Sequence, residues 1–455
     1  MKPLKLQGLP DYDVLDVKRH EVVLGSAGRL LHRLQQDDVD SGSWNLRESV
    51  WPALGARAAR DAKYLQLEPR LMLIPLSRIG ARGGFSGSDI LLGYFFDVEG
   101  RIYSSLPLVI KLSERTGGER KLIEEERLAQ SIRPYVGYNK DSFAVPIDLD
   151  TTQPGFDVLW SPFALSELVE FGPRPGLRNN DMRDLLDLKD KEAAEIQQSF
   201  ANLRTLIDAV YDTLNPLHTR AGLWDRYRRG LAAEYASYLR KFEDSWGTEW
   251  IEQWGRSEYV EELGNRYANP IWVIGQLQLS RDVDLICGAV HGDLHPGNVL
   301  YSDPHTPSII DFGWADADSH LAKDFVLLEC NLRFIYMPGE LPLGCVQKFS
   351  RWIGMSQTCE GLENLWCVEA QETIASIREY FKKLANQKDN GDQNGKDGEH
   401  VDFDIEYIVP LFLVSFGLLR YVGDYKNQIA ARQTVLNLAD YIHSTVLQKL
   451  HIPKP

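Results

Sequence analysis

The sequence is poor in the features that mark several classes of protein. Its 455 residues include five cysteines, an odd number, and no C-x-x-C pair. A disulfide framework and a zinc ribbon are therefore not expected, and a reducing compartment fits this composition. Basic residues are the scarcer charge, because 50 Lys and Arg face 65 Asp and Glu and leave a net charge of −15. Such an acidic field permits cationic partners but opposes nucleic acid and anionic membranes, so neither of these is predicted as a partner.

Long hydrophobic runs are also missing. The N-terminal stretch MKPLKLQGLPDYD has no apolar core of signal-peptide length. The longest apolar run covers residues 408–419, twelve residues that are interrupted by Pro410 and Ser415. It is too short to span a bilayer and predicts a buried helix instead. With 44% hydrophobic and 25% charged residues, the chain has ordinary globular composition and is expected to be a cytoplasmic protein of several lobes.

The patterning divides the chain into three parts. Residues 1–66 carry no catalytic signal and are expected to form an N-terminal extension that packs on the neighbouring lobe. Residues 67–160 predict an antiparallel sheet of five strands with one helix after the third strand. The strands are expected at residues 71–79, 89–100, 101–114, 143–147 and 156–160, and the helix at 118–132.

Residues 161–455 predict a mainly helical lobe. Residues 386–400 contain no apolar side chain, so they cannot bury surface to offset their ordering entropy and are expected to be disordered. Helices are expected at 181–214, 223–257, 324–336, 344–353, 364–384 and, as two helices, 405–450.

The most informative segment of this lobe is the catalytic segment expected at residues 290–325, which begins VHGDLHPGNVLYSDPHTPSIIDFGWA. Asn298 follows Asp293 by five residues, and Asp311 follows Asn298 by thirteen. Two apolar runs flank a turn between Asn298 and Asp311, which predicts a hairpin with these two side chains close together. An amide and a carboxylate are hard oxygen ligands for a Mg²⁺ ion that carries nucleotide phosphates. Asp293, on the preceding loop, is suited to accept a proton from an attacking hydroxyl.

The order H-G-D-x-x-x-x-N followed by I-D-F-G resembles the aminoglycoside phosphotransferase and choline kinase group, which has the protein-kinase-like fold. The resemblance covers about residues 71–336 and is dense at 290–325. It implies an α+β protein with a small antiparallel-sheet N-lobe, a large mainly helical C-lobe, and ATP and Mg²⁺ as cofactors. It also implies that Asp293 is the catalytic base, that Asn298 and Asp311 bind Mg²⁺, and that His291 braces the catalytic loop.

Enzymes of this group need a glycine-rich loop over the nucleotide phosphates. Residues 80–87 read G-x-x-G-G-x-x-G, which departs from the G-x-G-x-x-G of protein kinases. Glycines allow backbone N–H groups to approach phosphate oxygens closely. A glycine-rich hairpin turn is the alternative interpretation. The candidate phosphate-binding residues are Gly83, Gly84, Ser86 and Gly87.

The group also needs a lysine on the third strand, and Lys111 ends the apolar run at 108–110. A lysine ammonium inside a β-rich lobe requires a counter-charge or a phosphate. Its partner is expected on the following helix. Glu125 lies nearest the apolar side of that helix and is the preferred partner, with Glu124 as the alternative.

Three further positions have a proposed role. Residues 156–163 resemble the hinge between the lobes, where an adenine would bond to backbone. Asp324 is either the N-cap of the next helix or, as the resemblance implies, a tie for the catalytic loop. His295 either contacts the γ-phosphate or the substrate, or is a loop histidine bonded to backbone.

The predicted acceptor of the phosphoryl group is a hydroxyl of a small molecule. Asp324 follows Asp311 by only thirteen positions, which leaves no room for the long segment on which protein kinases dock a peptide. Asp316 and Asp318 fit a cationic acceptor such as an amino sugar or amino alcohol, or they are acidic loop residues in water. An atypical protein Ser/Thr kinase is the first alternative. A nucleotide-binding pseudokinase scaffold is the second, although every expected charged group is present.

Overall fold

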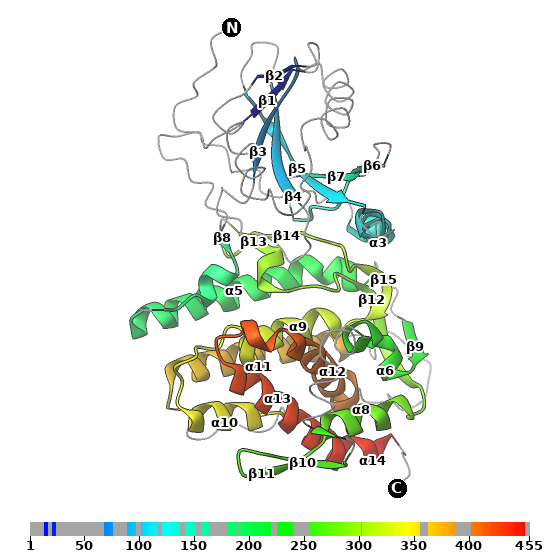
Figure 1. Ribbon diagram of the computed structural model, residues 1–455, viewed down its shortest axis with the longest axis vertical. Coiled ribbons are helices and arrows are strands. Elements are labelled where there is room, and N and C mark those ends of the chain that lie inside the picture. The colour runs from blue at the N-terminus through cyan, green and yellow to red at the C-terminus, as the bar shows by residue number, and fades with distance from the viewer. Residues whose placement is uncertain are drawn as a thin grey trace, which may run out of the picture. The chain divides into compact units, whose positions relative to one another are not determined.

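The computed structural model contains two compact units (Figure 1). The first comprises Met1–Asn180 and Leu300–Trp314, and the second comprises Asp181–Val299 and Ala315–Pro455. The structure describes residues 13–16, 21–23, 68–75, 89–96, 102–115, 121–136, 142–151, 156–162, 180–189, 191–219, 225–240, 254–255, 257–301, 303–354, 363–386 and 402–450. The predicted disordered loop at 386–400 lies outside these residues except for Asn386.

The first unit is built on a seven-stranded sheet with the order β2-β1-β3-β4-β5-β7-β6. All neighbouring strands in this sheet are antiparallel. Helix α3 follows β5, as predicted, and buries Leu122, Ala129 and Ile132. The bounds are β1 Asp13–Asp16, β2 Glu21–Val23, β3 Glu68–Pro75, β4 Asp89–Phe96, β5 Ile102–Glu114, α3 Lys121–Val136, β6 Asp148–Asp150 and β7 Phe156–Pro162.

The strand predicted at 143–147 is wrong, because the sheet strand β6 lies at Asp148–Asp150 instead. Phe143 forms a single parallel bridge with Ile309, and its ring packs against Phe312 with centroids 6.2 Å apart. The apolar residues of this stretch therefore pack on the 300–314 segment. The sequence assigned residues 300–314 to the helical lobe. These contacts explain why they belong to the first unit instead.

The predicted hairpin before Asp311 is present as β13 (Val299–Tyr301) and β14 (Pro307–Ile309), which are neighbours in a three-stranded sheet. The N-terminal extension was expected only to pack on the neighbouring lobe. Its strands β1 and β2 instead extend the sheet, because β1 pairs with the edge of β3 and β2 pairs with β1.

The second unit contains most of the helices and a three-stranded antiparallel sheet with the order β15-β12-β9. Its strands are β9 Asp225–Arg229, β12 Val283–Val290 and β15 Asp316–His320. The helix predicted from residue 223 is wrong at this place, because β9 pairs with β12 along five residues. Pairing with an open strand edge satisfies this backbone and overrides the local helical pattern.

Apart from a helix at Pro270–Gln278, for which no separate helix was predicted, the other helices of this unit lie close to their predicted ranges. Figure 1 labels most of them. A two-stranded hairpin, β10 (Tyr259–Glu262) with β11 (Asn265–Ala268), and a short strand β8 (Asn180–Asp181) complete the elements. The helices are α4 Arg183–Leu186, α5 Ala193–His218, α6 Leu231–Glu234, α8 Pro270–Gln278, α9 Lys323–Cys330, α10 Leu343–Arg351, α11 Leu365–Asn386, α12 Val409–Leu418, α13 Gln428–Tyr441 and α14 Leu447–Lys449.

Helix α12 is the buried helix that the apolar run predicted, and all ten of its residues are buried. The flanking π and 3-10 turns extend the helical run to Asp404–Asp424, which is long and apolar enough to cross a membrane by length and composition. However, 78% of its most apolar window is buried inside the protein, and it packs against α9 and α13. These contacts are those of a core helix.

Candidate active site

Lys111 joins three distant parts of the first unit. Its ammonium lies 2.6 Å from Oε1 of Glu125 on α3 and 2.9 Å from Oδ1 of Asp311 after β14. The lysine is buried, and burial alone would lower its pKa. The charges of Asp311 and Glu125 outweigh burial and raise the pKa of Lys111 above its ordinary value. The ammonium is therefore charged and holds two carboxylates at one point.

Glu125, and not Glu124, is the glutamate that reaches Lys111. Glu124 is exposed and pairs with Arg127 one turn further along α3. Burial raises the pKa of Glu125 even though Lys111 opposes this shift. The apolar face of α3 therefore selects which of the neighbouring carboxylates meets the ammonium.

Asp311 adopts a left-handed backbone conformation with φ of +64°. Such a conformation costs a non-glycine residue free energy, and aspartate is among the residues that adopt it most readily. Phe312, next in the chain, is fully buried. A Cβ on Gly313 would lie 3.4 Å from the side chain of Glu125. The turn thus presents the Asp311 carboxylate to Lys111 while it packs closely on α3.

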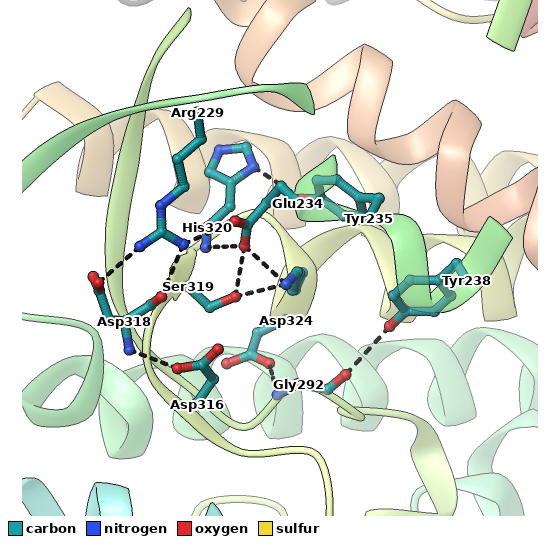
Figure 2. Close-up of polar contacts among 11 residues, drawn as sticks. Arg229, Glu234, Tyr235, Tyr238, Gly292, Asp316, Asp318, Ser319, His320 and Asp324 are labelled. Carbon is teal, nitrogen blue, oxygen red and sulfur yellow. Dashed lines mark hydrogen bonds and ion pairs between the residues drawn. The ribbon is translucent and has the colours of Figure 1, made fainter. Parts of the chain in front are cut away.

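The loop predicted to be catalytic, here called the catalytic loop (residues 291–298), begins where β12 ends and is anchored by Asp324. The fully buried Asp324 carboxylate accepts a hydrogen bond from the backbone N–H of His291 at 2.9 Å. It accepts a second from the backbone N–H of Gly292 at 2.8 Å (Figure 2). Nε2 of His218 on α5 lies 3.0 Å from the same carboxylate. Burial would raise the pKa of Asp324, but the hydrogen bond and charge of His218 contribute to lowering it. Asp324 therefore ties the loop to α9 and α5, and the side chain of His291 is buried.

Asp293 lies at the exposed end of this loop, with 34% of its side chain accessible. Its carbonyl accepts hydrogen bonds from the backbone N–H of His295, at 2.8 Å, and from Nδ2 of Asn298, at 2.9 Å. The hydroxyl of Tyr238 donates to the carbonyl of Gly292 at 3.2 Å (Figure 2). The loop backbone is thus held on both sides of Asp293 while its carboxylate reaches solvent.

Each of the two predicted metal ligands keeps an oxygen of the kind that Mg²⁺ prefers. Asn298 uses its amide nitrogen on Asp293, so its ligand atom would be Oδ1. The Asp311 side chain is 37% exposed and offers a carboxylate. Within the described residues, no group of three or more His, Cys, Asp or Glu is placed to hold a metal by itself. Mg²⁺ in phosphoryl-transfer sites commonly uses one or two protein oxygens, with phosphates and water supplying the rest.

Two positioning residues carried no signal in the sequence. His218 ends a long amphipathic helix, and Tyr238 lies beyond α6; neither belongs to a recognised motif. Only their contacts with Asp324 and Gly292 reveal a relation to the catalytic loop.

Of the two acids after D-F-G, Asp318 is less available to a cation than the sequence suggested. Nη2 of Arg229 lies 2.7 Å from the Asp318 carboxylate (Figure 2). Oδ1 of Asp316 accepts a hydrogen bond from the backbone N–H of Asp318. Glu234 binds both Arg229 and Lys323, and these cations help lower its pKa to about 2, although burial opposes the shift. Asp318 and Glu234 are therefore paired with cations of the protein, whereas Asp316 is exposed.

The structure does not describe the predicted phosphate loop. Gly83, Gly84, Ser86 and Gly87 lie outside the described residues. Of the predicted hinge, β7 is described as far as Pro162, where it pairs with Leu108 of β5.

Comparison with known proteins identifies one family model and several solved structures that are similar to this chain. A family model described as Ternary complex associated domain 9 matches residues 179–391, which is less than half of the chain. No curated protein matches the sequence. Several solved structures are similar to this chain, and three of them are described below.

An aminoglycoside phosphotransferase, APH(4)-Ia with ADP and hygromycin B, is 9% identical, with a TM-score of 0.39 and coverage of 80% of this chain and 96% of its own. Amicoumacin kinase with AMP-PNP and Ca²⁺ is 14% identical, with a TM-score of 0.37 and coverage of 81% and 90%. Ethanolamine kinase from Plasmodium vivax is 10% identical, with a TM-score of 0.35 and coverage of 93% and 95%. At these identities and TM-scores, the similarities carry no conclusion about activity or substrate.

Proposed function

We propose that this protein transfers the γ-phosphoryl group of Mg-ATP to a hydroxyl of a small molecule. The observation that carries the proposal is the buried ammonium of Lys111. It meets Glu125 fourteen residues away in sequence and Asp311 two hundred residues away. One ammonium between two carboxylates leaves an excess of negative charge at this point, which a metal ion with its nucleotide phosphates would suit. Phosphoryl transfer needs such a group to position the phosphates and their metal.

The roles of the remaining residues follow from their chemistry. Asp293 accepts the proton of the acceptor hydroxyl as the new bond between that oxygen and the γ-phosphorus forms. The bond from the γ-phosphorus to the bridging oxygen breaks, and ADP leaves with that oxygen. Asn298 and Asp311 would hold Mg²⁺, which neutralises phosphate charge when it is bound. Lys111 orients the phosphates of the same nucleotide.

The segment after D-F-G favours a small acceptor over a peptide. Residues 316–320 are paired as β15 with β12, and Arg229 and Glu234 bind to this strand or its neighbours. A segment fixed in this way is not an open platform for a polypeptide. Because Asp318 is already paired with Arg229, it offers little charge to bind a cationic acceptor. Amino sugars and amino alcohols are therefore tested beside acceptors that carry no positive charge.

The decisive experiment is transfer of label from [γ-³²P]ATP with Mg²⁺ to amino sugars, amino alcohols, nucleosides and generic proteins in parallel. The wild-type protein should label a small molecule, and Asp293→Asn should lower turnover by about 10²–10⁴-fold. Binding of Mg-AMP-PNP should stay within about twofold in this variant, because the carboxylate acts on the hydroxyl and not on the nucleotide.

Other outcomes would change the assignment. Equal turnover in Asp293→Asn would reject this residue as the base. Label found on protein alone would favour a protein kinase. Nucleotide binding without phosphate transfer to any acceptor, water included, would leave a pseudokinase scaffold.

A further inference from the structure

The guanidinium of Arg420 has no hydrogen-bond acceptor and no carboxylate partner among the residues that the structure describes. Its side chain is half-buried, and its Nε is buried without a partner. The terminal nitrogens Nη1 and Nη2 are not buried in this way and donate to no described residue, so they reach solvent. A buried N–H that is left unpaired costs free energy. Arg420 is therefore held in place at a cost, and the protein does not use its charge.

The ring of Tyr421 holds this guanidinium. Both residues lie in the 3-10 turn Leu419–Asp424, which directly follows α12. Cζ of Arg420 lies 4.2 Å from the centroid of the Tyr421 ring. Such a contact between a cation and an aromatic face fixes the direction of the side chain but does not neutralise its charge. The turn thus presents a positioned cation.

Tyr238 connects this helical run with the catalytic loop. A Cβ on Gly417, one turn before Arg420, would lie 2.8 Å from both the Cβ and the carbonyl oxygen of Tyr238. The hydroxyl of Tyr238 donates to the carbonyl of Gly292 at 3.2 Å (Figure 2). Burial raises the pKa of Tyr238, the charge of Asp293 raises it further, and the charge of Arg420 opposes both. The guanidinium and the proposed base therefore lie near the same hydroxyl.

A second guanidinium, that of Arg183, contacts the far end of the loop, but its charge is already used. Its Cζ would lie 3.2 Å from a Cβ on Gly297. Its Nε and Nη2 both donate to the carboxylate of Asp181. Nδ1 of His295 accepts a hydrogen bond from the Gly297 N–H at 3.0 Å and caps the turn Pro296–Asn298. This end of the loop is thus held by contacts within the protein.

We infer that Arg420 binds an anionic group of the acceptor, a carboxylate or a phosphate, while the acceptor hydroxyl lies at the catalytic loop. The inference rests on the proposed function, in which Lys111 and the metal already serve the nucleotide phosphates. A planar guanidinium matches two oxygens of a carboxylate or phosphate. Because the chain carries a net charge of −15, its field repels anions in general, and one unpaired cation beside the loop can select them.

Two substitutions separate the charge of Arg420 from its shape. Arg420→Gln removes the charge. Arg420→Lys keeps the charge but loses the planar pair of donors, so it tests the shape even where loss of the charge weakens the fold. Arg351→Gln is the matched control, since this exposed arginine lies in the last turn of α10 and has no role in the site. Melting temperatures of the three variants record any loss of stability.

The measurement is transfer of label from γ-labelled ATP to sets of hydroxyl compounds that share one carbon skeleton. Each set holds a neutral sugar, its amino sugar, its sugar acid and its sugar phosphate. The wild-type protein should label an acidic member with a kcat/KM about tenfold or more above the neutral and amino members. Arg420→Gln should lose this preference, mainly through KM, and Arg420→Lys should lie between the two. Affinity for Mg-AMP-PNP should stay within about twofold in every variant.

The results distinguish this inference from the proposed function. Nucleotide binding without transfer to any acceptor, water included, would overturn the proposed function. Transfer to neutral or amino compounds in preference to acidic ones, or to water alone, would overturn the inference only. A preference for acidic compounds that is unchanged in Arg420→Gln would also overturn it. A fall in Mg-AMP-PNP affinity equal to the fall in acceptor labelling would assign Arg420 to the nucleotide instead.

Discussion

Lys111 shows how burial and charge together decide the state of a single side chain. Only 10% of its side chain is accessible, and an isolated ammonium in such a place would lose its proton. Two carboxylates at hydrogen-bonding distance reverse this effect and raise its pKa. Because Glu125 and Asp311 together carry more negative charge than one ammonium neutralises, the group suits a further cation.

Replacing Asp311 with alanine tests this residue directly. Lys111 keeps Glu125 as a partner, so the fold should survive. The variant should lose the part of AMP-PNP affinity that depends on Mg²⁺, by about tenfold or more, because it loses a metal ligand. Calorimetric titration with Mg²⁺ and with EDTA measures that part. Glu124→Ala, which removes an exposed ion pair, is the control. Unchanged Mg-AMP-PNP affinity in Asp311→Ala would reject the metal role.

At the scale of elements, close approach between α5 and β12 positions the catalytic loop. Gly288 lies on β12, two residues before the strand ends at Val290. A Cβ at this position would lie 2.5 Å from the carbonyl oxygen of His218 and 2.8 Å from Cδ2 of Leu321. The end of α5 can therefore reach Asp324 only because this strand residue lacks a side chain.

Gly288→Ala should consequently push α5 away from β12. We expect a loss of about 1–3 kcal/mol in the free energy of unfolding, the usual cost of overpacking. Urea denaturation measures this loss. Gly275→Ala on α8 is the matched control, since its Cβ would have no neighbour within 4 Å. It should be neutral or stabilise the helix by up to about 1 kcal/mol. Equal stability of the two variants would show that the contact between α5 and β12 is loose.

At the scale of the whole molecule, a buried charge cluster joins the helices of the second unit. Glu329 on α9 binds Arg333, at 2.5 Å, and Arg378 on α11, at 2.7 Å. The hydroxyl of Tyr407 donates to the same carboxylate at 2.8 Å. Burial alone would raise the pKa of Glu329, but Arg378 and Arg333 outweigh it and lower the pKa to about 2. Three segments thus depend on one carboxylate.

Acid should therefore weaken this unit through Glu329. Its folded-state pKa lies below its ordinary value, so its stabilisation is complete above about pH 4.5 and is lost as the pH falls towards 2. Glu329→Gln should lose about 3–5 kcal/mol at pH 7, because two buried guanidiniums lose their counter-charge. It should also show a flatter fall of stability below pH 4.5. Urea denaturation across this range measures both effects, with the exposed Glu372→Gln as control. Equal pH profiles in the two variants would contradict this account.

Much of the first unit could be predicted because its signals are local. Strands β3, β4, β5 and β7 and helix α3 follow from apolar periodicity. The apolar side of α3 alone indicated Glu125 as the partner of Lys111. The strand at 143–147 and the helix from 223 were wrong, because Ile309 and β12, both distant in sequence, pair with these segments.

The amino-acid sequence by itself determined the α+β class, the order of the chemically active residues and the residue types at each position. These depend on periodicity and spacing, which are properties of neighbouring residues. Only the tertiary structure decided that Asp318 is paired with Arg229 and that His218 and Tyr238 support the catalytic loop. These facts depend on distances of a few ångströms between groups, and most of the groups lie far apart in the chain.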